Sequence, residues 1–234
     1  MNSEEDIKLF PEYNQQFPET SIQGSYAVSN GQVYIGDEQI LSCPLDTVFD
    51  YVKLDENSKI TEWNYDVLGN LDISKTKELS IINGKIGGDI DASYSGIEKI
   101  NQNIGGNLNI SHTKYFKYLT VEVGGNVNAF KSRLKKITKD IGGDLDIRRT
   151  KFFKSLDGKV GGNVDARRSN IKHINQNIGG DLNIRRTKKL GKINAKVGGK
   201  IYAYCVEDYL FFLRLFLGTS LVLYCIYLII LIFT

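Results

Sequence analysis

Residues that bind metals or form disulfides are scarce in this chain of 234 residues. Its three cysteines, Cys43, Cys205 and Cys225, share no spacing typical of a metal site or of a disulfide framework. The two histidines, His112 and His173, fall at repeat positions that other residue types occupy elsewhere, and neither has a repeated partner. We therefore expect no metal ion, and a chain that folds in a reducing cytoplasm.

Motifs of catalysis and of export are also missing. The sequence has no nucleophile elbow, no P-loop and no pair of carboxylates set apart from a repeating pattern, so we predict no catalytic residues, no cofactor and no enzyme activity. The N-terminus lacks the basic and apolar regions of a secretory signal. A formal net charge of +3 predicts no bulk attraction to nucleic acid, and no nucleic-acid-reading motif is present, so nucleic acid is not an expected partner.

What the sequence does contain is a repeat. A block of the form (Ile/Val)-Gly-Gly-(Asp/Asn)-apolar-(Asp/Asn)-(Ile/Ala) recurs at intervals that alternate between 19 and 18 residues. Its second glycine is found at Gly69, Gly88, Gly106, Gly125, Gly143, Gly162, Gly180 and Gly199. The last apolar position alternates strictly between Ile and Ala, and three residues later Thr alternates with Ser. The true repeat is therefore a 37-residue pair of coils, in which large and small core residues should interdigitate.

Polar and apolar residues alternate within each block, as in residues 144–147, which is the pattern of a short strand with one buried face. A second apolar patch follows, such as Phe152 and Phe153, and closes the coil onto a shared core. We expect the glycine pair to mark a sharp corner, where a positive φ or a close backbone approach excludes a Cβ atom. These features predict a mainly β fold, namely a solenoid of about eight coils of 18 or 19 residues.

The segment Leu145-Asp146-Ile147-Arg148-Arg149-Thr150-Lys151-Phe152 resembles the Leu-x-Leu-x-x-Asn-x-Leu core of bacterial leucine-rich repeats, with Thr or Ser at the asparagine position. Residues 68–203 carry this pattern. The coils are shorter than the about 20 to 29 residues usual for such repeats. A glycine pair also replaces the leading leucine, and no asparagine ladder is expected. The resemblance implies a curved horseshoe, and a plain β-helix with two or three short faces per turn is the alternative.

The N-terminal residues 1–67 do not repeat, and we interpret them as a capping region that shields the first coil. An independent binding module is the alternative. Residues 25–28 and 32–35 alternate around Asn30 and Gly31, which predicts a β-hairpin. After Pro44 the apolar residues of the segment 45–54 have helical spacing, which predicts a helix. The repeat solenoid is assigned to residues 68–208.

The hydrophobic tail is assigned to residues 209–234. Its segment 215–234 has no charged residue, and at the helical rise it is about 30 Å long, which matches the hydrocarbon core of a bilayer. We predict a C-terminal transmembrane helix here; a helix capping the last coil is the alternative, but it would need one polar face. Lys200 and Arg214 precede the segment and nothing charged follows, which predicts a tail-anchored membrane protein with its repeat domain in the cytoplasm.

The candidate binding site is a stripe of arginines at the two positions that follow the strand in three consecutive coils. Its members are Arg148, Arg149, Arg167, Arg168, Arg185 and Arg186. Like charges about 4.8 Å apart repel by about 0.9 kcal/mol in water, so the stripe needs compensation. One interpretation is surface ion pairs with Asp144, Asp146, Asp165 and Asp181. The other is an anion-binding edge for phosphates, an acidic protein or lipid headgroups.

Acidic columns such as Asp89 and Asp91 resemble those of calcium-binding β-rolls, but they lack the Gly-x-Asp spacing of such rolls, and Asn replaces Asp freely. No metal site is therefore predicted.

Two functions remain open at this point. The first is a membrane-tethered binding or scaffold module, whose partners are the membrane, a protein of unknown identity and anionic lipid headgroups. An anionic leaflet favours juxtamembrane Arg by about 1 kcal/mol each, and the arginine coils are those nearest the tail. The second is a structural or assembly protein, for example of a virus, that uses the solenoid as a spacer or polymerising unit.

Overall fold

Three ladders of parallel strands and bridges run along the chain in the computed structural model, which describes residues 24–187 and 190–203. The first ladder consists of β4 (Tyr51–Lys53), β7 (Leu71–Asp72), β9 (Ile90–Asp91), β11 (Leu108–Asn109), β13 (Val127–Asn128), β15 (Leu145–Asp146), β17 (Val164–Asp165), β19 (Leu182–Asn183) and β21 (Ile201–Tyr202). The second is divided into two sheets, since β10 and β12 are not paired. One sheet consists of β5 (Glu62–Trp63), β8 (Ile81–Ile82) and β10 (Lys99–Ile100), and the other of β12 (Tyr118–Leu119), β14 (Lys136–Ile137), β16 (Ser155–Leu156), β18 (His173–Ile174) and β20 (Lys192–Ile193). The third begins with β3 (Val48–Phe49) and β6 (Asp66–Val67) and continues as single-residue bridges at Ile86, Ile104, Val123, Ile141, Val160, Ile178 and Val197.

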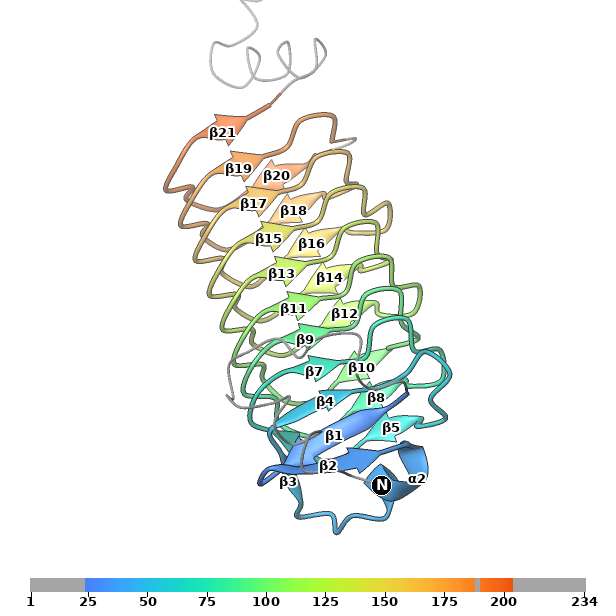
Figure 1. The fold of residues 1–234 in the computed structure, drawn as a ribbon. Coiled ribbons are helices and arrows are strands. Elements are labelled where there is room, and N and C mark those ends of the chain that lie inside the picture. The colour runs from blue at the N-terminus through green and yellow to red at the C-terminus, as the bar shows by residue number, and fades with distance from the viewer. Residues whose placement is uncertain (1–23, 188–189, 204–234) are drawn as a thin grey trace, which may run out of the picture.

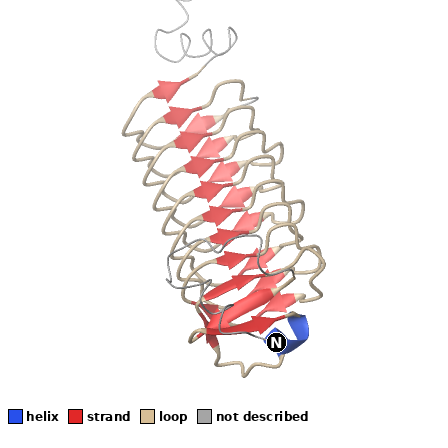
Figure 2. Ribbon diagram, in the orientation of Figure 1, coloured by secondary structure: helices blue, strands red, loops and turns tan. Residues whose placement is uncertain are grey.

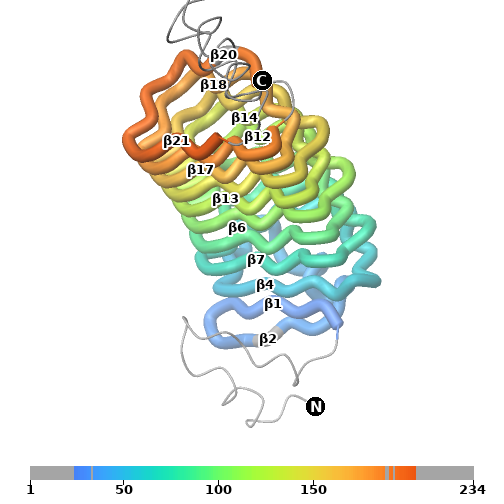
Figure 3. Tube along the Cα trace, turned by 90° about the horizontal axis from the view of Figure 1, so that it is seen from above, coloured from blue at the N-terminus to red at the C-terminus, as the bar shows by residue number. Residues whose placement is uncertain are grey.

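The successive steps of these ladders make the chain a mainly β solenoid of about eight coils, which confirms that prediction (Figures 1 and 2). The coils appear in Figure 3 as a stack of loops of similar outline. Strand ladders lie on more than one side of the coil, as expected of a β-helix.

The N-terminal hairpin is present, since β1 (Tyr26–Ser29) pairs antiparallel with β2 (Gln32–Ile35). Asn30 and Gly31 both have a positive φ, of 49° and 73°, as the turn between two such strands requires. On its other side β1 pairs antiparallel with β4, so the hairpin covers the N-terminal edge of the first ladder. Parallel pairing already begins at β3, inside the region predicted to be a cap.

The predicted helix over residues 45–54 is wrong. This segment forms β3 and β4, and the short helix α2 (Asp37–Leu41) precedes it. Phe49 and Val52 are buried because they pair with the next coil, whereas Leu45 is 76% exposed. Their helical spacing comes from a bend between two strands, and tertiary pairing outweighs it.

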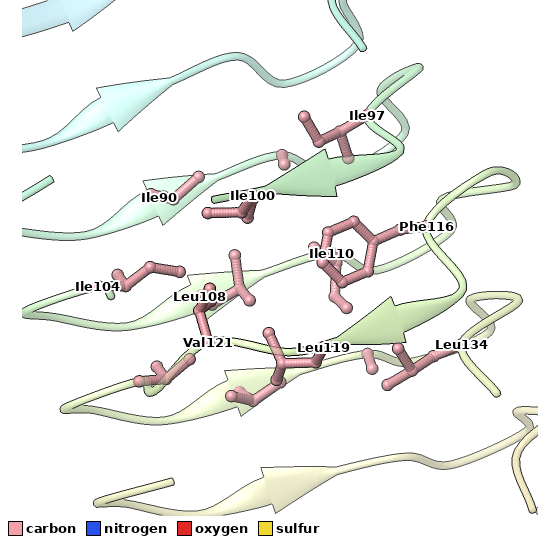
Figure 4. Packing of buried hydrophobic residues seen from close by; sticks show 14 of the residues in the cluster. Ile90, Ile97, Ile100, Ile104, Leu108, Ile110, Phe116, Leu119, Val121 and Leu134 are labelled. Atoms are coloured by element: carbon pink, nitrogen blue, oxygen red, sulfur yellow. The ribbon is translucent and has the colours of Figure 1, made fainter. Parts of the chain in front are cut away.

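The alternation of 19- and 18-residue coils has a single origin, the connection between the first and second ladders. In the coil that starts at Leu108 this connection is one residue longer than in the coil that starts at Val127. The longer connection buries Phe116, and the shorter ones on either side bury Ile97 and Leu134 (Figure 4). The Ile and Ala positions of residues 73–184 are all buried, and large and small side chains alternate along the axis.

The glycine pairs are required by close approach and not by a positive φ, since among the described glycines only Gly24, Gly31 and Gly36 have a positive φ. A Cβ atom on Gly142 would lie less than 3.0 Å from the carbonyl oxygen of Gly124 in the preceding coil. One on Gly143 would collide with Oδ1 of Asn126. Successive coils therefore touch backbone to backbone at this corner.

The Oδ1 atom of Asn126 belongs to a ladder of hydrogen bonds, made by Asp and Asn side chains, that was not predicted from the sequence. Oδ1 of Asn126 accepts a hydrogen bond of 2.6 Å from the backbone N–H of Asp144, and Oδ1 of Asp144 accepts one of 2.6 Å from Asn163. The same bond recurs from Asn70 to Lys200. This Asp/Asn ladder lies at the position after the glycine pair, and not at the Thr or Ser position that corresponds to the asparagine of leucine-rich repeats.

No helix among residues 24–187 and 190–203 is long and apolar enough to cross a bilayer. The predicted transmembrane segment 215–234 lies outside the described residues.

Candidate anion-binding groove

The arginines occupy a corner that every coil builds in the same way. After each of the strands β7 to β19 in the first ladder come one buried Ile or Ala and then two corner residues, and the second of these has a φ between 56° and 63°, in the left-handed region. We call these two residues the corner pair. The corner pairs are Ser74–Lys75, Ser93–Tyr94, Ser111–His112, Phe130–Lys131, Arg148–Arg149, Arg167–Arg168 and Arg185–Arg186. A residue other than glycine in this region is strained by about 1 kcal/mol, so neighbouring bonds must hold the corner.

Two hydrogen bonds to side chains fix the corner, one from outside the coil and one from inside. In the fifth coil, Oδ1 of Asp146 accepts the backbone N–H of Arg148 at 2.9 Å. On the inner side the buried hydroxyl of Thr150 donates to the carbonyl oxygen of Ile147 at 2.6 Å. The outer bond recurs in the other coils with Asp or Asn, which explains why either residue suits that column.

The first arginine of two pairs is matched by a carboxylate. The guanidinium of Arg148 donates to both carboxylate oxygens of Asp146, at 2.6 to 2.9 Å, and Arg167 makes the same bidentate contact with Asp165. The hydrogen bond with Asp146 raises the pKa of Arg148 more than burial lowers it. The ion-pair interpretation therefore holds for these two arginines. Asp144 and Asp181, also expected to pair, instead accept backbone N–H groups in the Asp/Asn ladder.

The second arginine of each pair has no such match. Arg149, Arg168 and Arg186 are exposed, and none of them has a carboxylate partner in the part of the chain that the structure describes. Their coils are adjacent, because the backbone N–H of Arg149 donates to the carbonyl of Arg167 and that of Arg168 to Arg185. Three uncompensated guanidinium groups thus stand about 4.8 Å apart along the axis.

All six arginines line one hollow of about 670 Å³, and Phe130 is the only other described residue that lines it. We call this hollow the arginine groove. At one end Phe130 lies under the guanidinium groups of Arg148 and Arg149, whose carbons are 5.2 and 5.7 Å from its ring centre. At the other end the guanidinium of Arg185 lies 5.8 Å from the ring centre of Tyr202. An aromatic ring therefore bounds each end of the stripe.

Before Phe130 the same corner column continues as stacked rings. Tyr94 and His112 stack with ring centres 4.3 Å apart, and His112 meets the Phe130 ring edge to face at 5.3 Å. Burial, and then the charge of Lys131, lower the pKa of His112. This aromatic column was not predicted from the sequence, although its three rings stand in consecutive corner pairs.

The second histidine of the chain does not line the arginine groove. His173 belongs to β18 in the second ladder.

Searches for related family models, curated proteins and solved structures found no match to this chain.

Proposed function

We propose that the protein is a binding module, not an enzyme, which captures an anionic partner in the arginine groove and is tethered to a membrane by its C-terminal tail. The observation that carries this proposal is the convergence of six guanidinium groups on one hollow, three of them without a carboxylate partner in the described coils. Arginine is the side chain best suited to bind phosphate or carboxylate oxygens, because its planar fork donates two parallel hydrogen bonds.

The structure of the corner does not explain why these six positions are arginine. Ser, Tyr, His, Phe and Lys fill the equivalent corner pairs in the other coils, on the same backbone. The fold therefore does not demand arginine at the corner. Repulsion between like charges opposes such stacking, so a bound anion would stabilise it.

The resemblance to bacterial leucine-rich repeats remains a proposal as well. Thr76, Thr113 and Thr150 occupy the position of the repeat asparagine, and their buried hydroxyl groups bond to backbone carbonyls within the corner. These bonds hold the corner from inside the coil. This supports the view that the corner pair itself is available to bind a ligand.

A flotation experiment tests the anion-binding role. Residues 1–208, the predicted capping region and solenoid, are used so that the tail cannot insert into the vesicles. We expect this chain to float with vesicles of phosphatidylserine and phosphatidylcholine and not with phosphatidylcholine alone. Replacing all six groove arginines with Gln should abolish flotation, whereas unchanged flotation would remove the proposal.

A matched control separates the groove from general basic charge. Six lysines near the second ladder, Lys114, Lys117, Lys135, Lys151, Lys154 and Lys172, can be replaced with Gln for the same change in net charge. We expect this variant to retain most of its flotation. The tether is tested in the full chain, which should stay in the membrane fraction after high-salt and alkaline washes.

The alternative function, a spacer or polymerising unit, has one supporting observation. In the described residues no strand pairs with β21 on its outer side, and Ile201 is 47% exposed. At the opposite end, however, the hairpin already covers the first ladder. Light scattering of the full chain in a neutral detergent should report a monomer, and a concentration-dependent series of larger species would favour assembly instead.

A further inference from the structure

The kind of anion that suits the arginine groove follows from its shape and its ends, and this inference rests on the proposed binding function. The groove spans three coils, so its rows of guanidinium groups extend over about 10 Å. Its volume of about 670 Å³ lies within the range typical of pockets for small molecules, about 300 to 1,000 Å³. A compact ligand with several negative charges would fill it.

A long linear polyanion fits the corner column less well. Such a polymer would run along the axis and leave the groove over Phe130. The next two corner pairs are Ser111–His112 and Ser93–Tyr94, which carry no permanent positive charge. Since the pKa of His112 is lowered, that ring stays neutral near pH 7. Past the three arginine coils the polymer would meet only Lys131 of the pair Phe130–Lys131 and then these two pairs, so its ionic contacts in this column would end one coil beyond the groove.

A flat anionic surface fits less well too. The six guanidinium groups surround a hollow, so a plane of headgroups would meet only the outermost of them. A group that projects from such a plane, or a free molecule of the same size, can enter. The recognised feature is thus a cluster of charges in three dimensions.

The choice of arginine indicates the chemistry of those charges. Lysine is accepted at this corner, because Lys75 and Lys131 have the same positive φ as Arg149. All six positions in the groove are nevertheless arginine. A guanidinium is distinguished from an ammonium by its bidentate contact with carboxylate and phosphate oxygens. A phosphate monoester has three terminal oxygens and up to two negative charges, so guanidinium groups in adjacent coils can share one.

We propose that the arginine groove binds a compact polyol that carries several phosphate monoesters. Arg149, Arg168 and Arg186 supply the uncompensated positive charge. Arg148 and Arg167, held by Asp146 and Asp165, form a preorganised wall. The same chemistry occurs on a phosphorylated lipid headgroup and on a soluble polyol phosphate.

The test uses the full chain in neutral phosphatidylcholine nanodiscs and isothermal titration calorimetry with inositol hexakisphosphate as the probe. We expect binding with one probe per chain. Replacing Arg149, Arg168 and Arg186 with Gln should weaken it by at least about a hundredfold, since each charged hydrogen bond contributes about tenfold or more. The matched control replaces Lys117, Lys135 and Lys154 with Gln and should change affinity by less than about threefold.

A second variant guards against loss of folding. Replacing the same three arginines with Lys keeps the charge at a corner that accepts Lys, and circular dichroism should be unchanged. We expect about a tenfold loss of affinity for the probe, because the bidentate contacts are lost. Equal affinity of the Lys variant and the unmodified chain would overturn the assignment of phosphate monoesters.

The remaining measurements distinguish a lipid headgroup from a soluble ligand. They also distinguish failure of this inference from failure of the proposed anion-binding function. Nanodiscs with phosphatidylinositol bisphosphate, compared with phosphatidylserine nanodiscs of equal surface charge, test the lipid headgroup; competition by the soluble probe supports the shared chemistry. If a single-stranded oligonucleotide or phosphatidylserine binds through the arginines and the hexakisphosphate does not, the compact ligand is wrong and the anion-binding function stands. If no anion binds through the arginines, both are wrong.

Discussion

The coils on the two sides of Phe130 share one backbone and differ in charge. Before it, the corner pairs Ser93–Tyr94 and Ser111–His112 present stacked rings; after it, three pairs present six arginines. Both regions have the same left-handed residue, the same outer hydrogen bond to Asp or Asn and the same buried hydroxyl. This difference shows that the fold determines the position of a corner side chain but not its residue type.

The largest expected effect tests whether the two regions share one frame. Gly105→Ala in the aromatic region and Gly142→Ala in the arginine region would each place a Cβ atom less than 3.0 Å from a backbone carbonyl of the preceding coil. Because backbone cannot give way easily, each should lower the free energy of unfolding by about 3 kcal/mol or more, as measured by urea denaturation.

Gly191→Ala is the control for these variants. Its Cβ atom would lie 2.8 Å from the carbonyl oxygen of Lys172, a milder overlap, and the loss should be smaller. Clearly unequal losses for Gly105→Ala and Gly142→Ala would contradict a common frame.

A smaller effect sharpens the difference in charge. Asp146→Asn together with Asp165→Asn removes the carboxylates that hold Arg148 and Arg167. The outer hydrogen bond of the corner should persist, because Asn109 and Asn128 already make it. We expect stability to fall by less than about 1 kcal/mol and anion affinity, measured by calorimetry, to rise several-fold.

Asp91→Asn is the control in the aromatic region, with half the charge change of the double variant. It alters the net charge in the same direction beside Ser93 and Tyr94, and it should leave anion affinity unchanged. A comparable rise in affinity would show that net charge, and not the groove, controls binding.

A third effect depends on pH and belongs to the aromatic region alone. Burial and the charge of Lys131 lower the pKa of His112 in the folded chain, so below about pH 6.5 the unfolded chain binds the proton more readily. Stability should therefore fall as pH decreases below this value. Urea denaturation between pH 5 and 7 measures the change, and His112→Phe should remove this part of it, since His173 is present in both proteins.

The smallest expected effect concerns strain at the corner. Asn tolerates the left-handed region better than other side chains do, so Lys75→Asn and Arg168→Asn should each stabilise the fold by a few tenths of a kcal/mol. The gain should be equal in the two regions. Lys135→Asn, outside the corner, should bring no gain, and a gain there would contradict the explanation.

Much of this architecture is readable in the sequence, because the glycine spacing and the alternation of Ile and Ala report directly on coil length and packing. The third ladder is not readable in the same way. Its bridged residue, such as Ile104, is the Ile or Val that begins each repeat block, but one residue per coil shows no alternation of polar and apolar side chains that would mark a strand. The helix predicted after Pro44 failed because pairing of Phe49 and Val52 with the next coil outweighs local spacing.

For the site, the sequence predicts the six arginines and four carboxylate partners, of which Asp146 and Asp165 form the ion pairs and Asp144 and Asp181 do not. It does not predict the boundaries of the groove. Phe130 replaces a serine of the earlier corner pairs, and Tyr202 occupies the column of Asn183. Only the folded chain brings their rings to the guanidinium groups.

The pairing of long and short coils bears on how such a groove could lengthen through gene duplication. Copying the 37 residues 148–184 would join Ile184 to a second Arg148, as Ile147 joins the first, and would preserve the order of Ile with Ala and Thr with Ser. Two more arginine pairs would be added without a new fold, because each coil contacts mainly its neighbours. Copying a single coil would instead place two coils with the same core residue, both Ile or both Ala, next to each other. We therefore expect such a groove to lengthen by duplication of two coils at a time.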